Sequence, residues 1–309
     1  MLHLRLISPA DRTHAVCSLL ADTVGVTNVI VIDGAARDPA GDVVLCDVAR
    51  EAADQLVDGL AALGLEQDGS ISIEEIDAAL SRVARQAQDD APGEGVDAVV
   101  WHQVEERTSE ESTLSVTFLV FLSIATLIAG IGVLLDQPIL IVGAMVVGPE
   151  FGPVAGLCVA LVLRERALVL RSLRALVVGF PVAMVVTMLA TVLARAVGLV
   201  EPAMLDSDHP LTSFISRPDV FSFIVAFLAG IVGILSLTAA KSGALIGVLI
   251  SVTTVPAAGN AAVALALGEP GMALGSALQL AINLCALVIA GTATLLVERR
   301  VRRRQTAPS

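Results

Sequence analysis

Two interrupted apolar stretches contain the residues best suited to chemistry. One holds the string GPEFGP at positions 148–153, and the other holds SVTTVPAAGN at positions 251–260. Proline removes a backbone hydrogen-bond donor and breaks or kinks a helix. Inside a membrane, the freed backbone groups are tolerated only where protein or a hydrated cavity satisfies them. Interruptions at matching places in two halves of a chain are typical of a transport site, so the two strings predict one.

Glu150 is the acidic residue in the middle of the first string. A charged side chain at the bilayer centre costs about 2.5 to 3.5 kcal/mol on insertion scales, which makes it a functional candidate by default. Its carboxylate is suited to binding a cation, carrying a coupling proton, or pairing with Lys241 or an arginine. The alternative interpretation is structural, with Glu150 hydrated near the interface or held in an ion pair that has no further role.

Other polar residues in or near the two strings are candidates for contacting a substrate. Gln279 and Asn283 lie about one helical turn apart and can therefore face the same interior cavity. Interhelical hydrogen bonding is an equal alternative for these hydroxyl and amide side chains. Gly148, Gly152 and Gly156 recur every four residues, which favours close helix packing over a pore lining. The candidate binding residues are Pro149, Glu150, Pro153, Ser251, Thr253, Thr254, Pro256, Asn260, Gln279 and Asn283.

Long apolar runs must position these residues. Hydrophobic residues make up 55% of the 309 residues and charged residues 16%, with a mean hydropathy of +0.82. Such a composition excludes an ordinary soluble enzyme. Runs of about 20 apolar residues have the length of a transmembrane helix. We therefore predict a mainly α-helical membrane protein with six spans, near 115–135, 138–163, 168–197, 219–238, 242–266 and 272–297.

Basic residues at the ends of these spans predict which side of the membrane each end occupies. Lys and Arg are concentrated in cytoplasmic segments. With the N-terminus inside, ten basic residues lie at cytoplasmic ends, against Arg195 and Arg217 on the opposite side. We therefore predict a multi-pass protein of the cytoplasmic membrane with both termini inside. The topology residues, which also suit contact with anionic lipid, are Arg164, Arg166, Arg171, Arg174, Lys241, Arg299, Arg300, Arg302, Arg303 and Arg304.

The two strings belong to longer stretches that resemble each other. Residues 127–165 resemble residues 227–269: Gly130 and Gly230 lie 100 residues apart, whereas Pro153 and Pro256 lie 103 apart, so an insertion would separate them. Three spans are an odd number, so a second copy is inverted in the membrane, as in many secondary transporters. We predict two inverted three-helix repeats, each with a broken second helix.

The first 110 residues form a separate, acidic part of the chain. They hold 21 Asp and Glu against 7 Lys and Arg, whereas residues 111–309 hold 10 against 12. Binding to nucleic acid needs a basic face, so the charge of this part argues against it. Strand patterns at 2–7, 26–32, 42–49 and 70–76 alternate with two helical patterns, the second ending at Gly64, and Gly41-Asp42 fits the central turn. This order, βαββαβ, predicts a ferredoxin-like α+β domain in the cytosol. The predicted domains are this fold at 1–76, a linker and amphipathic helix at 77–114, the membrane domain at 115–298, and a basic cytoplasmic tail at 299–309.

Residue types that usually build catalytic or metal centres are sparse. The four cysteines form no CxxC pair, and the predicted spans contain no histidine. Intramembrane catalysis usually needs paired Asp residues, a Ser with a base, or a His cluster. We therefore expect no enzyme, no metal site and no organic cofactor.

At the strings GAMVVGPEFGP (143–153) and KSGALIGVLISVTTVPAAGN (241–260), the sequence resembles a family of bacterial membrane proteins, domain of unknown function 389. The likeness covers the first five predicted spans and extends toward the whole chain. Many members have Ser-Pro-Leu-Met-Gly-Pro where this chain has residues 148–153, so the Pro and Gly positions match and Glu150 departs. The resemblance implies a membrane protein and supplies no substrate.

Two functions remain open on these observations. The leading hypothesis is a transporter-like or channel-like protein that moves an ion or small polar solute and is regulated or assembled through its acidic cytosolic domain. The alternative is a membrane sensor or scaffold without transport, whose cytosolic domain binds a ligand or partner. Stripes of small residues suit helix association within one chain or in a homo-oligomer.

Overall fold

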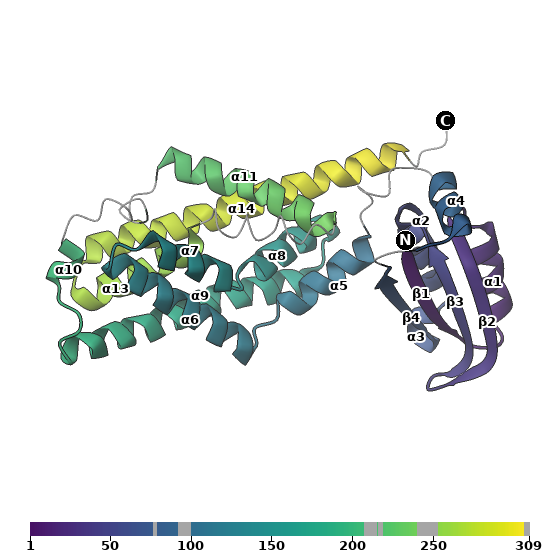
Figure 1. Cartoon of the computed structure of the whole chain (residues 1–309), viewed down its shortest axis with the longest axis horizontal. Helices are drawn as coiled ribbons and strands as arrows, with labels where there is room; N and C mark the ends of the chain where they lie inside the picture. Colours follow the sequence, from purple (N-terminus) through teal and green to yellow (C-terminus); the bar gives the residue numbers. More distant parts are fainter. Residues whose placement is uncertain (77–78, 92–99, 207–214, 216–218, 240–252, 306–309) are drawn as a thin grey trace. The chain divides into compact units, whose positions relative to one another are not determined.

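A computed structural model describes the chain except residues 77–78, 92–99, 207–214, 216–218, 240–252 and 306–309 (Figure 1). The chain divides into two compact units, Met1–Val104 and Glu105–Ser309. The first contains a sheet with helices, and the second is helical. Each unit is taken by itself below.

The N-terminal unit is built on a four-stranded antiparallel sheet. Its strands are β1 (Leu2–Ser8), β2 (Val26–Arg37), β3 (Ala40–Val48) and β4 (Ser70–Glu75), in the order β2-β3-β1-β4. Helix α1 (Thr13–Asp22) follows β1, while α2 (Arg50–Ala62) and the short α3 (Leu65–Asp68) follow β3. The predicted alternation of strands and helices is therefore present, with α3 as an additional element.

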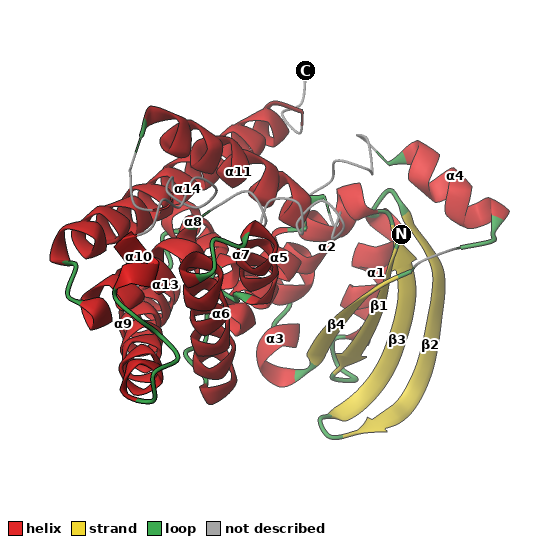
Figure 2. Cartoon of the chain, turned by 60° about the vertical axis from the view of Figure 1, so that its left-hand side comes forward, coloured by secondary structure: helices red, strands yellow, loops and turns green. Residues whose placement is uncertain are grey.

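The core of this unit follows from the two-residue period of a strand. Leu2, Leu4 and Leu6 of β1 are buried, and the residues between them are more exposed. Leu56 and Leu60 of α2 belong to the same apolar cluster. Each fully buried side chain of this kind contributes about 1.5 to 3 kcal/mol. Figure 2 shows α1 and α2 against one face of the sheet, which is the face that these leucines occupy.

The turn between β2 and β3 differs from the prediction. The two strands are joined at Asp38-Pro39, and both Gly41 and Asp42 lie within β3. A Cβ on Gly41 would clash with the backbone oxygen of Ser8 on the neighbouring strand. The glycine therefore permits close approach of two strands, a role that glycine has in sheets as well as in turns.

Asp42 connects three segments of the sheet unit. Its carboxylate accepts a hydrogen bond from Thr13 Oγ1 at 2.6 Å and another from the backbone N–H of Gly34 at 2.7 Å. The Thr13 hydroxyl, followed by the Gly34 amide, lowers the pKa of Asp42 from its usual value of 3.8, because hydrogen bonds to a carboxylate favour its charged form.

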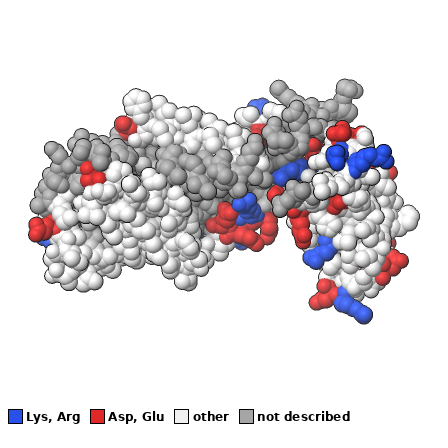
Figure 3. Space-filling model, viewed as in Figure 1, with Lys and Arg blue, Asp and Glu red and all other residues white. Residues whose placement is uncertain are grey.

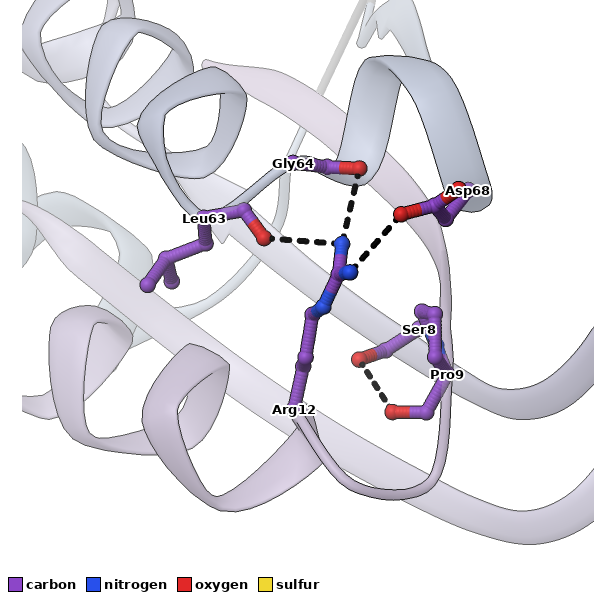
Figure 4. A network of polar contacts seen from close by, with 6 residues as sticks. All are labelled: Ser8, Pro9, Arg12, Leu63, Gly64 and Asp68. Carbon is purple, nitrogen blue, oxygen red and sulfur yellow. Dashed lines mark hydrogen bonds and ion pairs between the residues drawn. The ribbon is translucent and has the colours of Figure 1, made fainter.

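Arg12 ties the loop before α1 to the end of α2 (Figure 4). Its Nη1 donates to the backbone oxygens of Leu63 and Gly64, both at 3.1 Å, and its Nη2 donates to Asp68 Oδ2 at 2.7 Å. Gly64 has φ +80°, a left-handed conformation that favours glycine after a helix. The predicted end of the helix at this glycine is confirmed.

Two helices follow the last strand of the sheet in the sequence. They are α4 (Arg82–Asp90), whose first turn is capped by the Ser81 hydroxyl, and α5 (Trp101–Glu111). Val104 and Thr108 of α5 are buried at a spacing of four residues, as in an amphipathic helix. Helix α5 begins in the N-terminal unit and ends in the helical unit.

Four helices of the second unit are long and apolar enough to cross a membrane: α6 (Val116–Leu134), α9 (Arg166–Ala196), α11 (Val220–Thr238) and the segment Pro270–Val301 of α14 (Pro270–Gln305). Helices α7 (Pro138–Val147) and α8 (Phe151–Leu163) meet the same criterion as a pair and are bent by 50° at a short break. The remaining helices are α10 (Ala203–Asp206) and the apolar α13 (Thr254–Leu267), which is 14 residues long.

The described residues thus contain four candidate spans, or five if the bent pair is one span. The predicted break in the second span lies between Val147 and Phe151. Of the span predicted at 242–266, residues 254–266 lie in α13, which is an apolar helix shorter than the candidate spans, and residues 242–252 lie outside the described part of the chain.

Helix boundaries recur at a constant spacing in the helical unit. Helices α6 and α11 are both 19 residues long and begin 104 residues apart. Each is capped by the residue before it: Ser115 Oγ accepts from the backbone N–H three residues on at 3.0 Å, and Asp219 Oδ1 does the same at 2.7 Å. Side chains at these cap positions satisfy N–H groups that have no partner within the helix.

The same spacing relates α8 to α13. They begin 103 residues apart, and each ends at a residue in the left-handed conformation, Arg164 with φ 65° and Gly268 with φ 94°. The starts of these two pairs of helices therefore lie 103 or 104 residues apart, whereas Gly130 and Gly230 lie 100 apart.

The corresponding helices run in opposite directions. Near the start of α14, Ala273 shares an apolar cluster with the last residues of α6 and α13. Toward the other end of α14, Glu298 accepts from Thr238, the last residue of α11, at 3.0 Å, and Arg299 donates to the backbone oxygen of Val162 in α8 at 2.9 Å. Helices α6 and α13 therefore end where α14 begins, whereas α8 and α11 end near the end of α14.

The surface of the helical unit is largely apolar, as expected from the apolar composition of its sequence. Large apolar residues are exposed along these helices, including Leu170 at 70% and Leu193 at 66% in α9. Outside the grey atoms, Figure 3 shows broad areas of this unit without charged atoms. Exposed apolar surface of this extent is typical of helices that face lipid.

Candidate polar site between two half-helices

Helices α8 and α13, called the half-helices below, begin beside each other. Glu150 immediately precedes α8, and Thr254 is the first residue of α13. Thr254 Oγ1 donates a hydrogen bond to Glu150 Oε1 at 2.7 Å. Glu150 is 5% exposed and Thr254 is 1% exposed. The buried acidic residue predicted from the first string therefore meets a predicted hydroxyl from the second.

The prolines of the two strings occupy equivalent places in the half-helices. Pro153 is the third residue of α8, and Pro256 is the third residue of α13. Proline is tolerated in the first turn because the N–H groups there have no partner within the helix. Pro149 lies in the break before Glu150. All three prolines therefore shape the backbone at the start of a half-helix.

The break before α8 is closely packed around the carboxylate. A Cβ on Gly148 would clash with Glu150 Oε2 and would lie 2.7 Å from Val255 Cγ2. The carboxylate is therefore folded back over Gly148, where only glycine leaves enough room. Helix N-termini carry partial positive charge, which favours a carboxylate at the start of α8 and α13.

One face of α14 supplies amides and a hydroxyl to α13. Asn283 Nδ2 donates to Thr253 Oγ1 at 3.0 Å, and Gln279 Nε2 donates to Asn283 Oδ1 at 3.3 Å. About one turn further toward the start of α14, Asn260 Nδ2 donates to Ser276 Oγ at 2.8 Å. On α14, Ser276, Gln279 and Asn283 are separated by three, four and seven residues, so they share one face of that helix.

Ser276 is the member of this face that the sequence analysis missed. It is fully buried and pairs with the predicted Asn260. A signal was present, because Ser276 lies three residues before Gln279 and seven before Asn283 in an otherwise apolar run. A search for polar residues at helical spacing would have found it.

Three buried oxygen atoms of this site have no hydrogen-bond partner among the residues that the structure describes. They are Glu150 Oε2, Asn260 Oδ1 and Gln279 Oε1. Their residues are 5%, 3% and 0% exposed, respectively. Buried polar atoms usually find a partner. The site can therefore accept hydrogen bonds or coordinate a cation, and Glu150 is its one charged member in the described part of the chain.

Interhelical hydrogen bonding, the alternative to substrate contact for the hydroxyl and amide residues, is also observed. The pairs that meet across helices are Glu150 with Thr254, Thr253 with Asn283, and Asn260 with Ser276, whereas Gln279 donates to Asn283 of its own helix. Of the remaining predicted residues, Ser251 and Lys241 lie outside the described residues. The described residues form no ion pair with Glu150.

The glycine stripe of the first string packs mainly against α5. A Cβ on Gly152 would lie 2.7 Å from Glu111 Cβ, and one on Gly156 would clash with Ser112 Oγ just beyond α5. Ser112 Oγ also donates to the backbone oxygen of Gly152 at 3.4 Å. Two of the three glycines therefore serve close packing, and Gly148 makes room for the Glu150 carboxylate.

Several predicted topology residues lie near the ends of the helices. Arg171 Nη1 donates to Ser109 Oγ in α5 at 2.6 Å. Arg164, Arg166, Arg174 and Arg300 are exposed. The last turn of α14 includes Arg302, Arg303 and Arg304.

Metal-ligating residues do not gather in the part of the chain that the structure describes. No three residues among its His, Cys, Asp and Glu lie close enough together to hold a metal ion. The polar site instead combines one carboxylate with neutral oxygens.

Long apolar helices around a buried polar site are the features of a multi-pass membrane protein. The model of the family described as "Domain of unknown function (DUF389)" matches residues 145–289, which confirms the resemblance noted in the sequence. The match includes both half-helices and the polar face of α14. The chain is also 28% identical, over 148 residues, to "Uncharacterized protein MJ0678" of Methanocaldococcus jannaschii. That alignment covers 48% of this chain and 43% of the relative, so the chain spans less than half of the relative's length. No solved structure matches the chain.

Proposed function

We propose that this protein is a transporter-like or channel-like membrane protein that moves an ion or small polar solute through the site between the half-helices. The observation that carries the proposal is the contact of Glu150 with Thr254 where α8 and α13 begin. A buried carboxylate at the meeting point of two interrupted helices is expensive to insert, and such places bind substrates or coupling ions in transporters.

The proposed architecture has two inverted repeats of three spans, six in all. It is supported by the spacing of 104 residues between α6 and α11 and by the opposite directions of the corresponding helices. In such an arrangement, the two repeats rock around a central site and expose it alternately to each side.

We assign the N-terminal unit a ferredoxin-like fold with a regulatory or assembly role. The strand order β2-β3-β1-β4 and the sequence of its strands and helices support this assignment. Helix α5 provides the connection, because it starts in this unit and packs against Gly152 and Gly156 of α8. A shift of α5 along its axis would therefore reach the half-helix that begins after Glu150.

We further propose that the protein lies in the cytoplasmic membrane with both termini inside. The support is the exposed Arg164, Arg166 and Arg174 near the end of α8 and start of α9, together with the basic end of α14. Single-cysteine labelling of intact cells would test this topology. A residue introduced near Glu201 should react with an impermeant maleimide, and one introduced after α14 should react only after the cells are opened. The reverse pattern would refute the orientation.

A liposome flux assay tests transport itself. Purified full-length protein should carry an ion or small polar solute across the vesicle membrane, and Glu150→Gln should lower that flux at least about tenfold, equivalent to about 1.4 kcal/mol. Glu165→Gln is the matched control, because Glu165 is an exposed residue between α8 and α9. Flux that is absent in the wild type, or that is equal in Glu150→Gln and the wild type, would refute the proposal.

A sensor or scaffold without transport is the second proposal, and the sheet supports it. Strand β2 lies at the sheet edge and exposes Val29, Ile30, Val31 and Ile32 by 41% to 52%. Exposed apolar edge strands pair readily with another chain, which also favours a homo-oligomer. Neither proposal includes a catalytic reaction. Wild-type protein that moves no solute, yet loses oligomeric state when Ile30 is replaced by Lys, would favour this second function.

A further inference from the structure

We propose that the site between the half-helices binds one monovalent alkali metal cation, Na⁺ in particular, with Glu150 as its charged ligand. This inference rests on the proposed function and deepens it, because it assigns the charge and the chemical class of the bound species. The atoms that carry it are the unpartnered Glu150 Oε2, Gln279 Oε1 and Asn260 Oδ1.

The kind of atom left without a partner indicates the kind of ligand. All three atoms are oxygens, and the amide nitrogens of Gln279 and Asn260 already donate hydrogen bonds. An unpartnered acceptor is satisfied by a hydrogen-bond donor or by a cation, whereas an anion would add repulsion to Glu150. The site is therefore suited to a positively charged species.

The number of charges indicates the valence. Among the described residues, Glu150 supplies the one negative charge of the network, and its other members are hydroxyls and amides. Sites for Ca²⁺ and Mg²⁺ usually employ several carboxylates or a phosphate. A single carboxylate surrounded by neutral oxygens balances a single positive charge, which favours an alkali metal ion.

The number of unpartnered atoms distinguishes a metal ion from a proton. A proton on Glu150 would satisfy Oε2 alone and would leave the buried oxygens of Gln279 and Asn260 unpartnered. A metal ion, by contrast, takes carboxylate and amide oxygens alike as ligands.

The test uses purified full-length protein in lipid nanodiscs, prepared in choline chloride. Thermal unfolding is followed while NaCl replaces choline chloride at constant ionic strength, and ²²Na⁺ binding is measured at equilibrium. Na⁺ should raise the Tm saturably by several degrees, and ²²Na⁺ should bind at about one ion per chain. Equal Tm values in NaCl and choline chloride, without saturable ²²Na⁺ binding, would overturn the proposal.

Two variants and one control connect the binding to the named atoms. Glu150→Gln should weaken Na⁺ binding at least tenfold, and Gln279→Met, which removes the amide oxygen at similar volume, should also weaken it. Glu165→Gln should bind as the wild type does. If Glu150→Gln does not fold, Gln279→Met and the wild-type titration still decide the outcome. Stabilisation by Ca²⁺ alone, or by protons alone without any alkali ion effect, would refute the proposal.

The outcomes separate this inference from the proposed function. Saturable Na⁺ binding without flux in liposomes would support the cation site and refute transport. Flux of a solute without binding of an alkali ion would support transport and refute the cation site.

Discussion

Replacing Thr254 by Val should expose the energetic role of the hydrogen bond to Glu150. The change removes the hydroxyl that donates to Glu150 Oε1 at 2.7 Å and keeps a β-branched side chain of similar volume. Because Glu150 Oε2 already has no partner in the described structure, the variant would leave both carboxylate oxygens without a side-chain donor. Glu150 is 5% exposed, so water cannot easily replace the lost hydrogen-bond donor.

The expected cost can be bracketed. Hydrogen bonds to charged groups are worth about 1.5 to 3 kcal/mol in proteins, whereas hydrogen bonds between membrane helices average about 0.6 and reach about 1.7 kcal/mol in double-mutant cycles. Glu150 combines a charge with near-complete burial. We therefore expect Thr254→Val to lower the free energy of unfolding by about 1.5 to 1.7 kcal/mol, where the two ranges overlap.

Reversible unfolding in mixed micelles of increasing SDS fraction, followed by far-UV circular dichroism, measures this cost. Thr294→Val is the matched control, because the Thr294 hydroxyl donates to Ala290 of its own helix at 2.9 Å. The control should change stability by less than about 0.5 kcal/mol, as substitutions away from buried networks usually do. In the background of Glu150→Gln, the cost of Thr254→Val should fall, which gives a positive coupling energy. Equal costs for Thr254→Val and Thr294→Val, with no coupling to position 150, would refute the assigned role.

Three other expectations concern packing, pH and thiol reactivity. Gly259→Ala should lower the free energy of unfolding by about 1 to 3 kcal/mol, as overpacking does, because its Cβ would lie 2.8 Å from a backbone oxygen of α6. Gly143→Ala, which has open space around it, should leave the free energy of unfolding unchanged in the same SDS titration. The hydrogen bonds of Asp42 lower its folded pKa from 3.8, so its stabilisation is present above the unfolded pKa and lost as pH falls through the folded one. The protection factors of backbone amides in β2 and β3, which correct for the intrinsic pH dependence of hydrogen exchange, should therefore fall below about pH 4, and Asp42→Asn should remove that change. Burial, followed by the charge of the next residue, raises the pKa of the Cys46 thiol to about 12; a maleimide should therefore label Cys17 in the folded protein much faster than Cys46, and equal rates would contradict the burial of Cys46 in the core.

The parts of the fold that depend on local sequence were predictable. Uninterrupted apolar runs give both ends of α6, α9 and α11 and the start of α14 within two residues, because length and hydropathy determine such helices directly. Helix α14 continues to Gln305, beyond the apolar run that predicted an end at 297. The break before α8 was equally readable, since proline acts on its own helix. Glu150 stood out for the same reason, as a charge within an apolar run.

The contacts that give these residues their roles depend on distant segments and were not predictable. Ser276 gains its place in the site by pairing with Asn260, and that pairing depends on the register between α13 and α14. Gly156 faces Ser112, just beyond the predicted amphipathic helix, for which the sequence indicated no packing partner. Gly41 suggested a turn, yet it serves a close approach of β1 and β3. In each case, the residue type indicated a special role, but the residue that it contacts lies far away in the sequence.

The spacing of the proposed repeat differs between its glycines and its helix ends. Glycines are frequent in transmembrane helices, so pairs such as Gly130 and Gly230 align easily by chance. Positions at helix ends are more selective, because a cap must satisfy backbone groups that have no other partner. Ser115 and Asp219 begin helices of equal length, 104 residues apart. Helix ends are therefore the better guide to an internal repeat in an apolar chain.

At the spacing of 103 residues between the half-helices, the position before each helix differs in charge between the two halves. Glu150 precedes α8, and Thr253 precedes α13. A second carboxylate in place of Thr253 would add an insertion cost of about 2.5 to 3.5 kcal/mol, and it would repel Glu150 unless a divalent ion bound between them. Thr253 instead accepts a hydrogen bond from Asn283 at 3.0 Å and joins the neutral part of the network. The proposed ligand charge of +1 therefore follows from this difference between the two halves, and a fully symmetric pair of half-helices would not specify it.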